Sequence, residues 1–209
     1  MLKVERTSVM NFENAIRGAR NPMNSWARMD SSYDETGCYI LGENDLGLAK
    51  RLARAGSDHR KFLRQIFVSV DITAPLYWWK EFDTYKVGTV ANSTSTMHKI
   101  HTKEFAREDF SCDRLDVGGL AALDAVIAYL EGERQKFVAN KEDRQSWHNM
   151  IQMLPSSYNQ MRTVSLNYEN LINIYYARRY HKLPEWHVLC DWIMSLPYAA
   201  DLIAVKEEC

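Results

Sequence analysis

The segment IFVSVDIT, residues 66–73, constrains the fold of this chain more than any other stretch of the sequence. Val68, Val70 and Ile72 share one face of an extended chain, and polar side chains occupy the positions between them. This period of two predicts a β-strand with one buried and one polar face. Such a strand needs neighbouring strands for its backbone and a packed layer over its apolar face. The sequence therefore predicts a sheet.

Helical spacing dominates the rest of the chain. Residues 115–138 predict the longest helix, whose inward seam is formed by Leu120, Leu123, Ile127 and Leu130. A further strand is expected at residues 1–9, and residues 90–105 read as loop or irregular strand. Shorter helices are predicted at residues 11–20, 75–85, 146–154, 167–180 and 184–196.

Residues 45–56, DLGLAKRLARAG, carry a complete helix signature. Asp45 is the expected N-cap, and Gly56 is the expected residue just beyond the C-terminus. Leu48, Leu52 and Ala55 are the expected inward residues. No internal repeat or linker divides the chain, so the simplest prediction is a single α+β domain over residues 1–209.

The composition excludes several classes of protein. The chain has 209 residues and a formal net charge of −1, which gives no electrostatic footprint for nucleic acid. Its apolar runs are too short to cross a bilayer, and its first residues lack the apolar core of a signal peptide. The four cysteines are scattered, as expected for reduced thiols, so we expect a cytoplasmic protein without a Cys-x-x-Cys site.

Common catalytic and binding motifs are absent from the sequence. It contains no P-loop, no Gly-x-Gly-x-x-Gly and no Gly-x-Ser-x-Gly. His98 and His101 are three apart, but their surroundings are not helical and no third ligand is near, so no metal site is predicted. The hydroxyl-rich run at residues 93–96 is compatible with phosphate binding or with a solvated turn.

One helical segment is unusually rich in amides and arginine. Asn167, Asn173 and Arg178 lie on or beside the apolar pattern of residues 167–180. Buried amides and guanidinium groups are stable only when their hydrogen bonds are satisfied. Two readings remain open from spacing alone: a ligand site, or a polar stripe that faces solvent or an interface.

The same segment resembles a known family. The family of flavin-dependent thymidylate synthases has Leu-Pro, then a tyrosine, then Thr-Val-Asn-x-x-x-Leu-x-Asn-x-x-x-x-Arg, then a helix with Gln-Trp-Glu-Ile. The segment at residues 154–188 follows this order and ends in PEWHV. The matching residues are Leu154, Pro155, Tyr158, Asn167, Leu171, Asn173 and Arg178.

The resemblance extends upstream and includes part of the family signature. Residues 48–72 are similar to the family's helix, turn and following strand. The signature reads Arg-His-Arg-x-x-Ser-x-Asn-x-x-Ser-x-Arg-Tyr, and this chain has YKVGTVANSTSTMH at residues 85–98. Asn92 and Ser95 match in register. The departures are Tyr85, Lys86 and Val87 in place of the triplet, Val90 for serine, Met97 and His98 for Arg-Tyr, and Ile151 for a later arginine.

The resemblance implies a fold and a function. The fold is a central, mostly antiparallel sheet with long packed helices. Family members are homotetramers that bind FAD and dUMP at subunit junctions and methylate dUMP to dTMP with methylenetetrahydrofolate and NADPH. By resemblance, Asn92, Asn167 and Asn173 would bind the flavin nucleotide, and Ser95 and Arg178 would bind dUMP. No catalytic residue is assigned.

The lost arginines leave three hypotheses. The first is a working, divergent flavin-dependent thymidylate synthase. The second is a relative that keeps the fold and binds a nucleotide or flavin but catalyses another reaction. The third is a structural or regulatory homo-oligomer that has lost both ligands. Arginine binds phosphate through paired donors, a geometry that Lys86 does not reproduce. The loss of the triplet favours the second and third hypotheses over the first.

Overall fold

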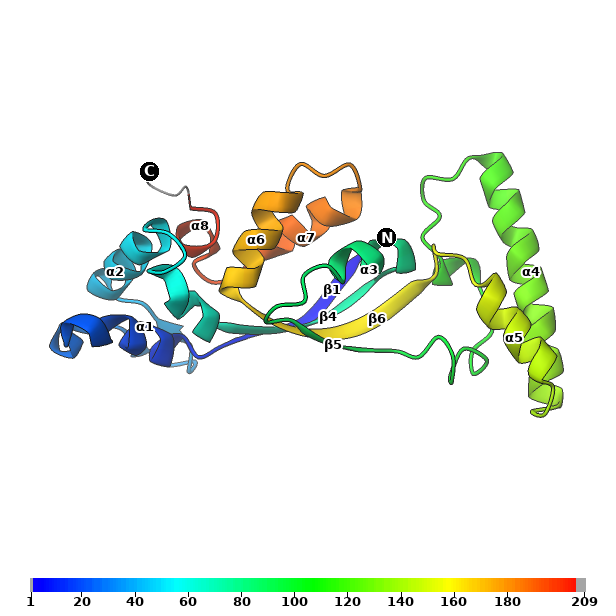
Figure 1. The fold of residues 1–209 in the computed structure, drawn as a ribbon, viewed down its shortest axis with the longest axis horizontal. Helices are drawn as coiled ribbons and strands as arrows, with labels where there is room; N and C mark the ends of the chain where they lie inside the picture. Colours follow the sequence, from blue (N-terminus) through cyan, green and yellow to red (C-terminus); the bar gives the residue numbers. More distant parts are fainter. Residues whose placement is uncertain (1, 206–209) are drawn as a thin grey trace. The chain divides into compact units, whose positions relative to one another are not determined.

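The structure, a computed structural model, describes residues 2–205. It has the expected α+β architecture, with an antiparallel sheet and long helices (Figure 1). The main sheet has four strands in the order β1-β4-β6-β5, so neighbouring strands are mostly distant in sequence. Within the described residues, no helix combines the length and apolar character needed to cross a membrane. The strands are β1 (Lys3–Met10), β4 (Phe67–Pro75), β5 (Val90–Ser93) and β6 (Asn159–Asn167).

Strand β4 confirms the alternating pattern of the sequence. Val68, Val70 and Ile72 are almost completely buried, and the residues between them are half-buried. Pro75 is the last residue of this strand and also the N-cap of helix α3 (Leu76–Phe82), so the helix begins one position after the proline that was expected to be its first residue. Its backbone is extended, with φ −67° and ψ 151°, which suits the end of a strand.

The described chain divides into two compact units. Unit 1 comprises residues 2–3, 71–84 and 91–163, and unit 2 comprises residues 4–70, 85–90 and 164–205. Each unit has its own helices and its own buried residues, so each is described by itself.

Two antiparallel helices dominate unit 1. Helix α4 (Val117–Ala139) packs along α5 (Arg144–Met153), and each begins with an aspartate cap, Asp116 and Asp143. The bounds of α4 confirm the predicted long helix to within two residues. Its apolar cluster consists of Ile100, Phe105, Phe110, Leu123, Leu130, Phe137 and Met150.

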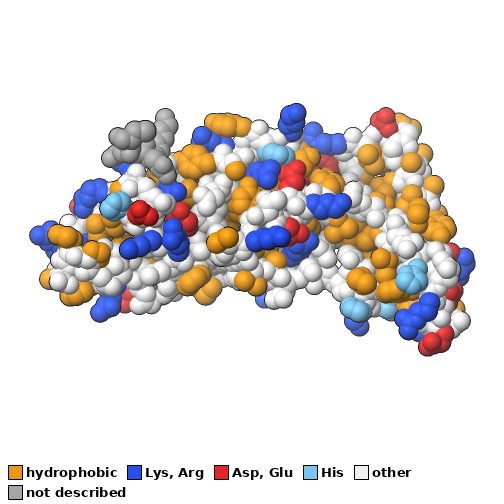
Figure 2. All heavy atoms as spheres, viewed as in Figure 1, with side chains coloured by type: hydrophobic (Ala, Val, Ile, Leu, Met, Phe, Trp, Pro, Cys, Tyr) orange, Lys and Arg blue, Asp and Glu red, His pale blue; other side chains and the backbone are white. Residues whose placement is uncertain are grey.

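Helix α4 is apolar on more than its inward face. Leu123 and Leu130 are buried as predicted, whereas Leu120 and Ile127 are only partly buried. Figure 2 shows orange side chains on the surface of the region that α4 and α5 occupy in Figure 1. Exposed hydrophobic side chains on or just before α4 are Leu115, Val117, Tyr129 and Val138.

Unit 2 is built from helices around a buried aromatic and aliphatic core. Tyr168 and Trp186 are completely buried, and Phe12 meets Tyr168 edge-on at 5.5 Å between ring centres. A short 3₁₀ segment, η3 (Arg60–Gln65), packs against three helices. The elements are α1 (Phe12–Arg20), η1 (Asn21–Met23), η2 (Trp26–Arg28), β2 (Ser32–Tyr33), β3 (Tyr39–Ile40), α2 (Glu43–Arg54), α6 (Tyr168–Arg178), α7 (Pro184–Met194) and α8 (Ala199–Leu202).

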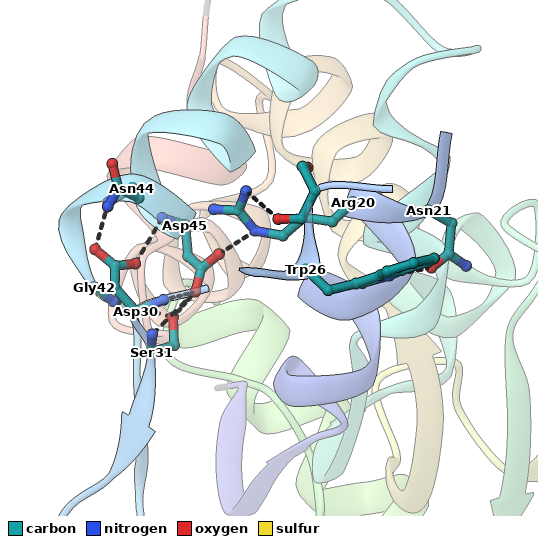
Figure 3. A network of polar contacts seen from close by, with 9 residues as sticks. Arg20, Asn21, Trp26, Asp30, Ser31, Gly42, Asn44 and Asp45 are labelled. Carbon is teal, nitrogen blue, oxygen red and sulfur yellow. Dashed lines mark hydrogen bonds and ion pairs between the residues drawn. The ribbon is translucent and has the colours of Figure 1, made fainter. Parts of the chain in front are cut away.

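The start of α2 differs from the prediction. The helix begins two residues before Asp45, with Gly42 as its N-cap, and Asp45 is completely buried. The carboxylate of Asp30 accepts the N–H groups of Asn44 and Asp45 at 2.8 and 3.0 Å and so serves the first turn from outside the helix (Figure 3). Asp30 therefore supplies the capping acceptor that the sequence had assigned to Asp45.

The inward face of α2 is also shifted from the prediction. Asp45, Ala49 and Ala53 are buried, in place of Leu48, Leu52 and Ala55. Asp45 reaches inward because its Oδ1 accepts from the Nε of buried Arg20 at 2.6 Å (Figure 3). The predicted end of the helix is confirmed, since Gly56 adopts φ +89° directly after the C-cap.

Candidate functional site

Helix α6 begins with a reciprocal pair of asparagines. The Oδ1 atom of Asn167 accepts the N–H of Asn170 at 3.0 Å, and the Oδ1 atom of Asn170 accepts the N–H of Asn167 at 3.1 Å. This is a capping box, with amides in place of the usual hydroxyl and carboxylate. Asn167 is buried, and its acceptor is used by the helix itself. The family resemblance implied a flavin contact for Asn167, and the structure shows that its side-chain oxygen caps the helix.

A turn of chain from before β5 lies against this end of α6. The side-chain nitrogen of Asn170 donates to the carbonyl of Val87 at 2.7 Å. Gly88 follows with φ +74°, a conformation that favours glycine. A Cβ atom at Gly88 would lie 3.1 Å from the amides of both Asn167 and Asn170. The segment at residues 85–88, which includes positions 85–87 where the resemblance places the family triplet, is therefore held close to the N-terminus of α6.

The other end of α6 holds an arginine in a fixed position. The Nε atom of Arg178 donates to the hydroxyl of Tyr85 at 2.8 Å. The guanidinium carbon lies 4.6 Å from the ring centre of Trp186, the third residue of α7, and 5.6 Å from that of Tyr85. Arg178 is half-buried, and Trp186 is completely buried beneath it. Stacking and a directed hydrogen bond together fix the plane of the guanidinium group.

The base of α6 is anchored in the core of unit 2. Glu169 accepts from the Nε atom of Arg60 with both carboxylate oxygens, at 3.1 Å each, and both side chains are nearly buried. Tyr168 donates its hydroxyl to the carbonyl of Pro197 at 2.7 Å, and burial raises the pKa of this tyrosine. These contacts place Asn170 and Arg178 on a helix that is held at its first turn.

The remaining predicted residues are placed as follows. Asn173 lies in the middle of α6 and is exposed. Asn92 lies in β5 within unit 1 and is also exposed. The hydroxyl of Ser95 accepts the N–H groups of Met97 and His98 at 3.2 and 2.8 Å, so the hydroxyl-rich run forms a turn. Asn92 and Ser95 belong to a different unit from Asn167, Asn173 and Arg178.

Several other basic residues could replace the lost arginines of the family signature. Arg162 is committed within unit 1, since it donates to Asp83 at 2.7 Å and stacks on Trp79 at 4.2 Å. Arg179 lies among three tyrosine rings, with its guanidinium 4.7 Å from the ring centre of Tyr176. Lys86 is exposed and follows Tyr85 directly. Arg178 contacts the segment at residues 85–88 through Tyr85, and Lys86 belongs to that segment.

Sequence reasoning missed the contributions of Tyr85 and Asn170. The spacing of Asn167 and Asn170 before an apolar run is a capping-box signal that was available in the sequence. Tyr85 lies 93 residues before Arg178, and no local pattern predicts their contact.

In the described part of the chain, no group of three or more histidine, cysteine or acidic side chains could hold a metal ion.

The donor set fits a phosphorylated nucleotide. The guanidinium of Arg178 and the exposed ammonium of Lys86, the residue after Tyr85, are groups of the kind that bind phosphate. The amides of Asn92 and Asn173 are exposed, so each presents a donor and an acceptor that suit the ring edges of a flavin. We call Tyr85, Arg178 and Trp186, which contact one another at the C-terminal end of α6, the α6 cluster.

Comparison with solved structures identifies the fold. The chain is similar to thymidylate synthase X from Helicobacter pylori, solved with FAD and dUMP, at TM-score 0.67 and 17% identity, covering 99% of this chain and 100% of the other. It is also similar to PolB from Streptomyces cacaoi, a UMP/dUMP methylase bound with 5-Br dUMP, at TM-score 0.67 and 13% identity, covering 99% and 96%. No family model and no curated protein sequence matches the chain. The chain therefore has the fold of flavin-dependent thymidylate synthases, as the sequence resemblance implied.

Proposed function

We propose that this chain is a divergent member of the flavin-dependent thymidylate synthase family that binds a pyrimidine nucleotide monophosphate, dUMP or UMP, together with FAD. The similarity to these two nucleotide-bound proteins extends over nearly the whole length of this chain and over nearly the whole length of each of them. The α6 cluster supplies the local chemistry for the nucleotide phosphate.

The single observation that carries the proposal is the fixed position of Arg178. Its guanidinium is stacked on Trp186 and oriented by Tyr85, although it lies only half-buried at the end of a helix. The stacking and the hydrogen bond are a restraint that exists before any ligand binds. A phosphate-binding arginine benefits from it, because less side-chain freedom is then lost on binding.

The proposed reaction is methylation of the pyrimidine ring, with methylenetetrahydrofolate as the carbon source and NADPH as the reductant. FAD, when bound, would supply the hydride. The chain's own residues bind and orient: Arg178 and Lys86 take the phosphate, and Ser95 is the second proposed dUMP contact. Asn92, Asn167 and Asn173 are the proposed flavin contacts.

A second function is favoured by one observation. Tyr85 and Val87 stand where the family has arginines, and Tyr85 is an internal partner of Arg178. This arrangement lowers the positive charge available to a flavin pyrophosphate. The alternative is a protein that binds the nucleotide without methylating it.

Assembly into a homotetramer is part of the proposal. Apolar side chains on and just before α4 are exposed in the single chain, with Val117 at 84% and Tyr129 at 42%. Exposed hydrophobic side chains on one long helix favour contact with another protein surface. A second copy of the chain is the expected partner, because the family places its ligands at subunit junctions.

Two measurements test the proposed function. The purified protein should be yellow, and calorimetric titration with dUMP and UMP should show saturable binding. Release of tritium from C5 of labelled dUMP, in the presence of FAD, NADPH and methylenetetrahydrofolate, separates methylation from binding alone. A colourless protein that binds neither nucleotide would overturn the proposal. Binding without tritium release would support the second function.

A further inference from the structure

A cavity of about 430 Å³ lies between the start of α1 and the hairpin that β2 and β3 form. All of its lining residues belong to unit 2, and none of them belongs to the α6 cluster. The volume is in the range of small-molecule sites, about 300 to 1,000 Å³. We call it the hairpin cavity, and the lining residues that define its chemistry are Phe12, Glu13, Tyr33, Tyr39 and Pro197.

Two tyrosines form an aromatic wall of the hairpin cavity. Tyr33 and Tyr39 are paired across the hairpin, and their ring centres are 5.0 Å apart with planes inclined by 62°. Tyr33 is 57% exposed, and Tyr39 is half-buried. The turn between the strands is held by Asp34, whose carboxylate accepts the N–H groups of Thr36 and Cys38 at 2.9 Å each. The wall therefore exists before any ligand binds.

The apolar floor of the cavity is fixed to the core of unit 2. Phe12 is buried and meets the rings of Tyr168 and Tyr198 edge-on, at 5.5 and 5.7 Å between ring centres. The carbonyl of Pro197 accepts from the hydroxyl of Tyr168 at 2.7 Å. The hydroxyl of Tyr198 accepts the N–H of Leu41, just after β3, at 2.9 Å. The hairpin and the floor are therefore anchored to the same group of aromatic residues.

Of the described residues that line the cavity, only Glu13 carries a charged side chain. Its Oε2 atom accepts from the hydroxyl of Tyr33 at 2.8 Å, which places the carboxylate at the aromatic wall. Arg17 follows one turn later in α1, but within the described residues it forms no ion pair with Glu13. The contact with Glu13 raises the pKa of Tyr33. Burial raises the pKa of Tyr39, and nearby carboxylates, including that of Glu13, act in the same direction.

We propose that the hairpin cavity binds a small organic ammonium ion, with the cation against the rings of Tyr33 and Tyr39 and beside the carboxylate of Glu13. The faces of aromatic rings attract cations, and the attraction is strongest for cations that shed water easily. Alkyl groups on the nitrogen suit the apolar floor formed by Phe12 and Pro197. This site is independent of the proposed nucleotide and flavin contacts.

The test is NMR titration of the full-length protein with choline and with 3,3-dimethylbutan-1-ol. The alcohol has the shape of choline, but a carbon atom replaces the charged nitrogen. Choline should bind saturably, and the alcohol should bind at least about 5-fold more weakly, because it lacks both the cation–π attraction and the ion pair.

Two variants test the residues of the site. Glu13→Gln keeps an oxygen that can accept from Tyr33 and removes the charge, and Tyr33→Leu removes a ring. Each should weaken choline binding about 2- to 5-fold. Glu43→Gln and Tyr180→Leu are the matched controls, since both positions are exposed and neither lines the cavity, and both should bind choline like the wild type.

Three results would overturn the inference. They are no saturable choline binding by the wild type, equal affinity for choline and the neutral alcohol, or wild-type affinity for choline in Glu13→Gln. Circular dichroism checks that each variant is folded, and Glu13→Gln decides the matter if Tyr33→Leu is not. Neither variant should change the affinity for dUMP, so this inference and the proposed function stand or fall separately.

Discussion

The guanidinium carbon of Arg178 lies 4.6 Å from the centre of the Trp186 ring, and the two residues belong to consecutive helices. The last residue of α6 thus stacks on the buried tryptophan of α7. This contact links the amide-rich helix to the following one at the point where the proposed phosphate would bind.

Arg178→Ala should weaken dUMP binding about 10- to 100-fold, because charge-assisted hydrogen bonds to the phosphate are lost. The melting temperature should fall only slightly, since the side chain is half-buried and Trp186 remains packed in the core. Arg178→Lys should recover part of the affinity through its charge. Titration and thermal melting of the same preparations check this. A collapse of the melting temperature would identify Arg178 as a structural residue instead.

Asn167→Ala should lower the free energy of unfolding by about 1 kcal/mol, the usual cost of removing an N-cap acceptor. Asn167→Asp keeps that acceptor and should retain wild-type stability, because a carboxylate also suits a helix N-terminus. Urea unfolding measures both variants. If the aspartate variant is stable but loses its yellow colour, the amide nitrogen contributes to flavin binding. Equal destabilisation by both changes would contradict the capping role.

Asp45→Asn should cost about 3 to 5 kcal/mol, since it leaves buried Arg20 without its charged partner. Burial by itself raises the pKa of Asp45, but hydrogen bonds from Ser31 and Arg20 hold that pKa below its ordinary value, so the carboxylate is charged near neutral pH. Glu43→Gln, an exposed change in the same helix, should shift stability by no more than about 0.5 kcal/mol. Chemical denaturation compares them. Similar losses for the two variants would contradict the role of the ion pair.

Acid should weaken unit 1 through Glu131. Hydrogen bonds from Arg134 at 2.6 and 2.7 Å lower the pKa of Glu131 from 4.5 to about 2. A carboxylate with a lowered pKa stabilises the folded state above pH 4.5, and this contribution is lost as the pH falls toward 2. Glu131→Gln should therefore reduce the loss of stability between these values. Urea unfolding across the range measures it, and an unchanged dependence would exclude Glu131 as a contributor.

A charge on the exposed face of α4 should disrupt assembly. Tyr129→Glu places a carboxylate at a 42% exposed position on that helix, and the proposed tetramer should dissociate into smaller species. Glu142→Lys, an exposed change in the turn after α4, should leave the mass unchanged. Light scattering gives the mass, and circular dichroism confirms folding. A wild-type protein that is monomeric would contradict the assembly proposal.

The sequence predicted the elements whose signals are local. Strand β4, the long helix α4 and helix α7 with its initial Pro184 all follow from short-range periodicity or a single residue. Whether these segments form a strand or a helix depends on the spacing of their apolar residues. Tertiary contacts then favour the same structure.

The failures occurred where distant residues decide the outcome. The inward face of α2 is turned toward Asp45 because Arg20, 25 residues earlier, supplies a buried partner. Before α2 the chain forms two short strands, β2 and β3, which pair with each other and were not among the predicted elements. The contact of Tyr85 with Arg178 spans 93 residues and likewise has no local signal. Burial of an aspartate is unfavourable by itself, and sequence periodicity does not reveal the distant residue whose charge offsets this cost.

The capping box at Asn167 also bears on how such a protein would change over evolutionary time. Replacement of this asparagine frays a helix, so selection for a folded chain would retain it in a lineage that had abandoned its ancestral chemistry. An exposed position such as Asn173 has no comparable protection, and drift there costs the architecture little. An asparagine retained at position 173 is therefore better evidence for the proposed flavin contact than one retained at position 167.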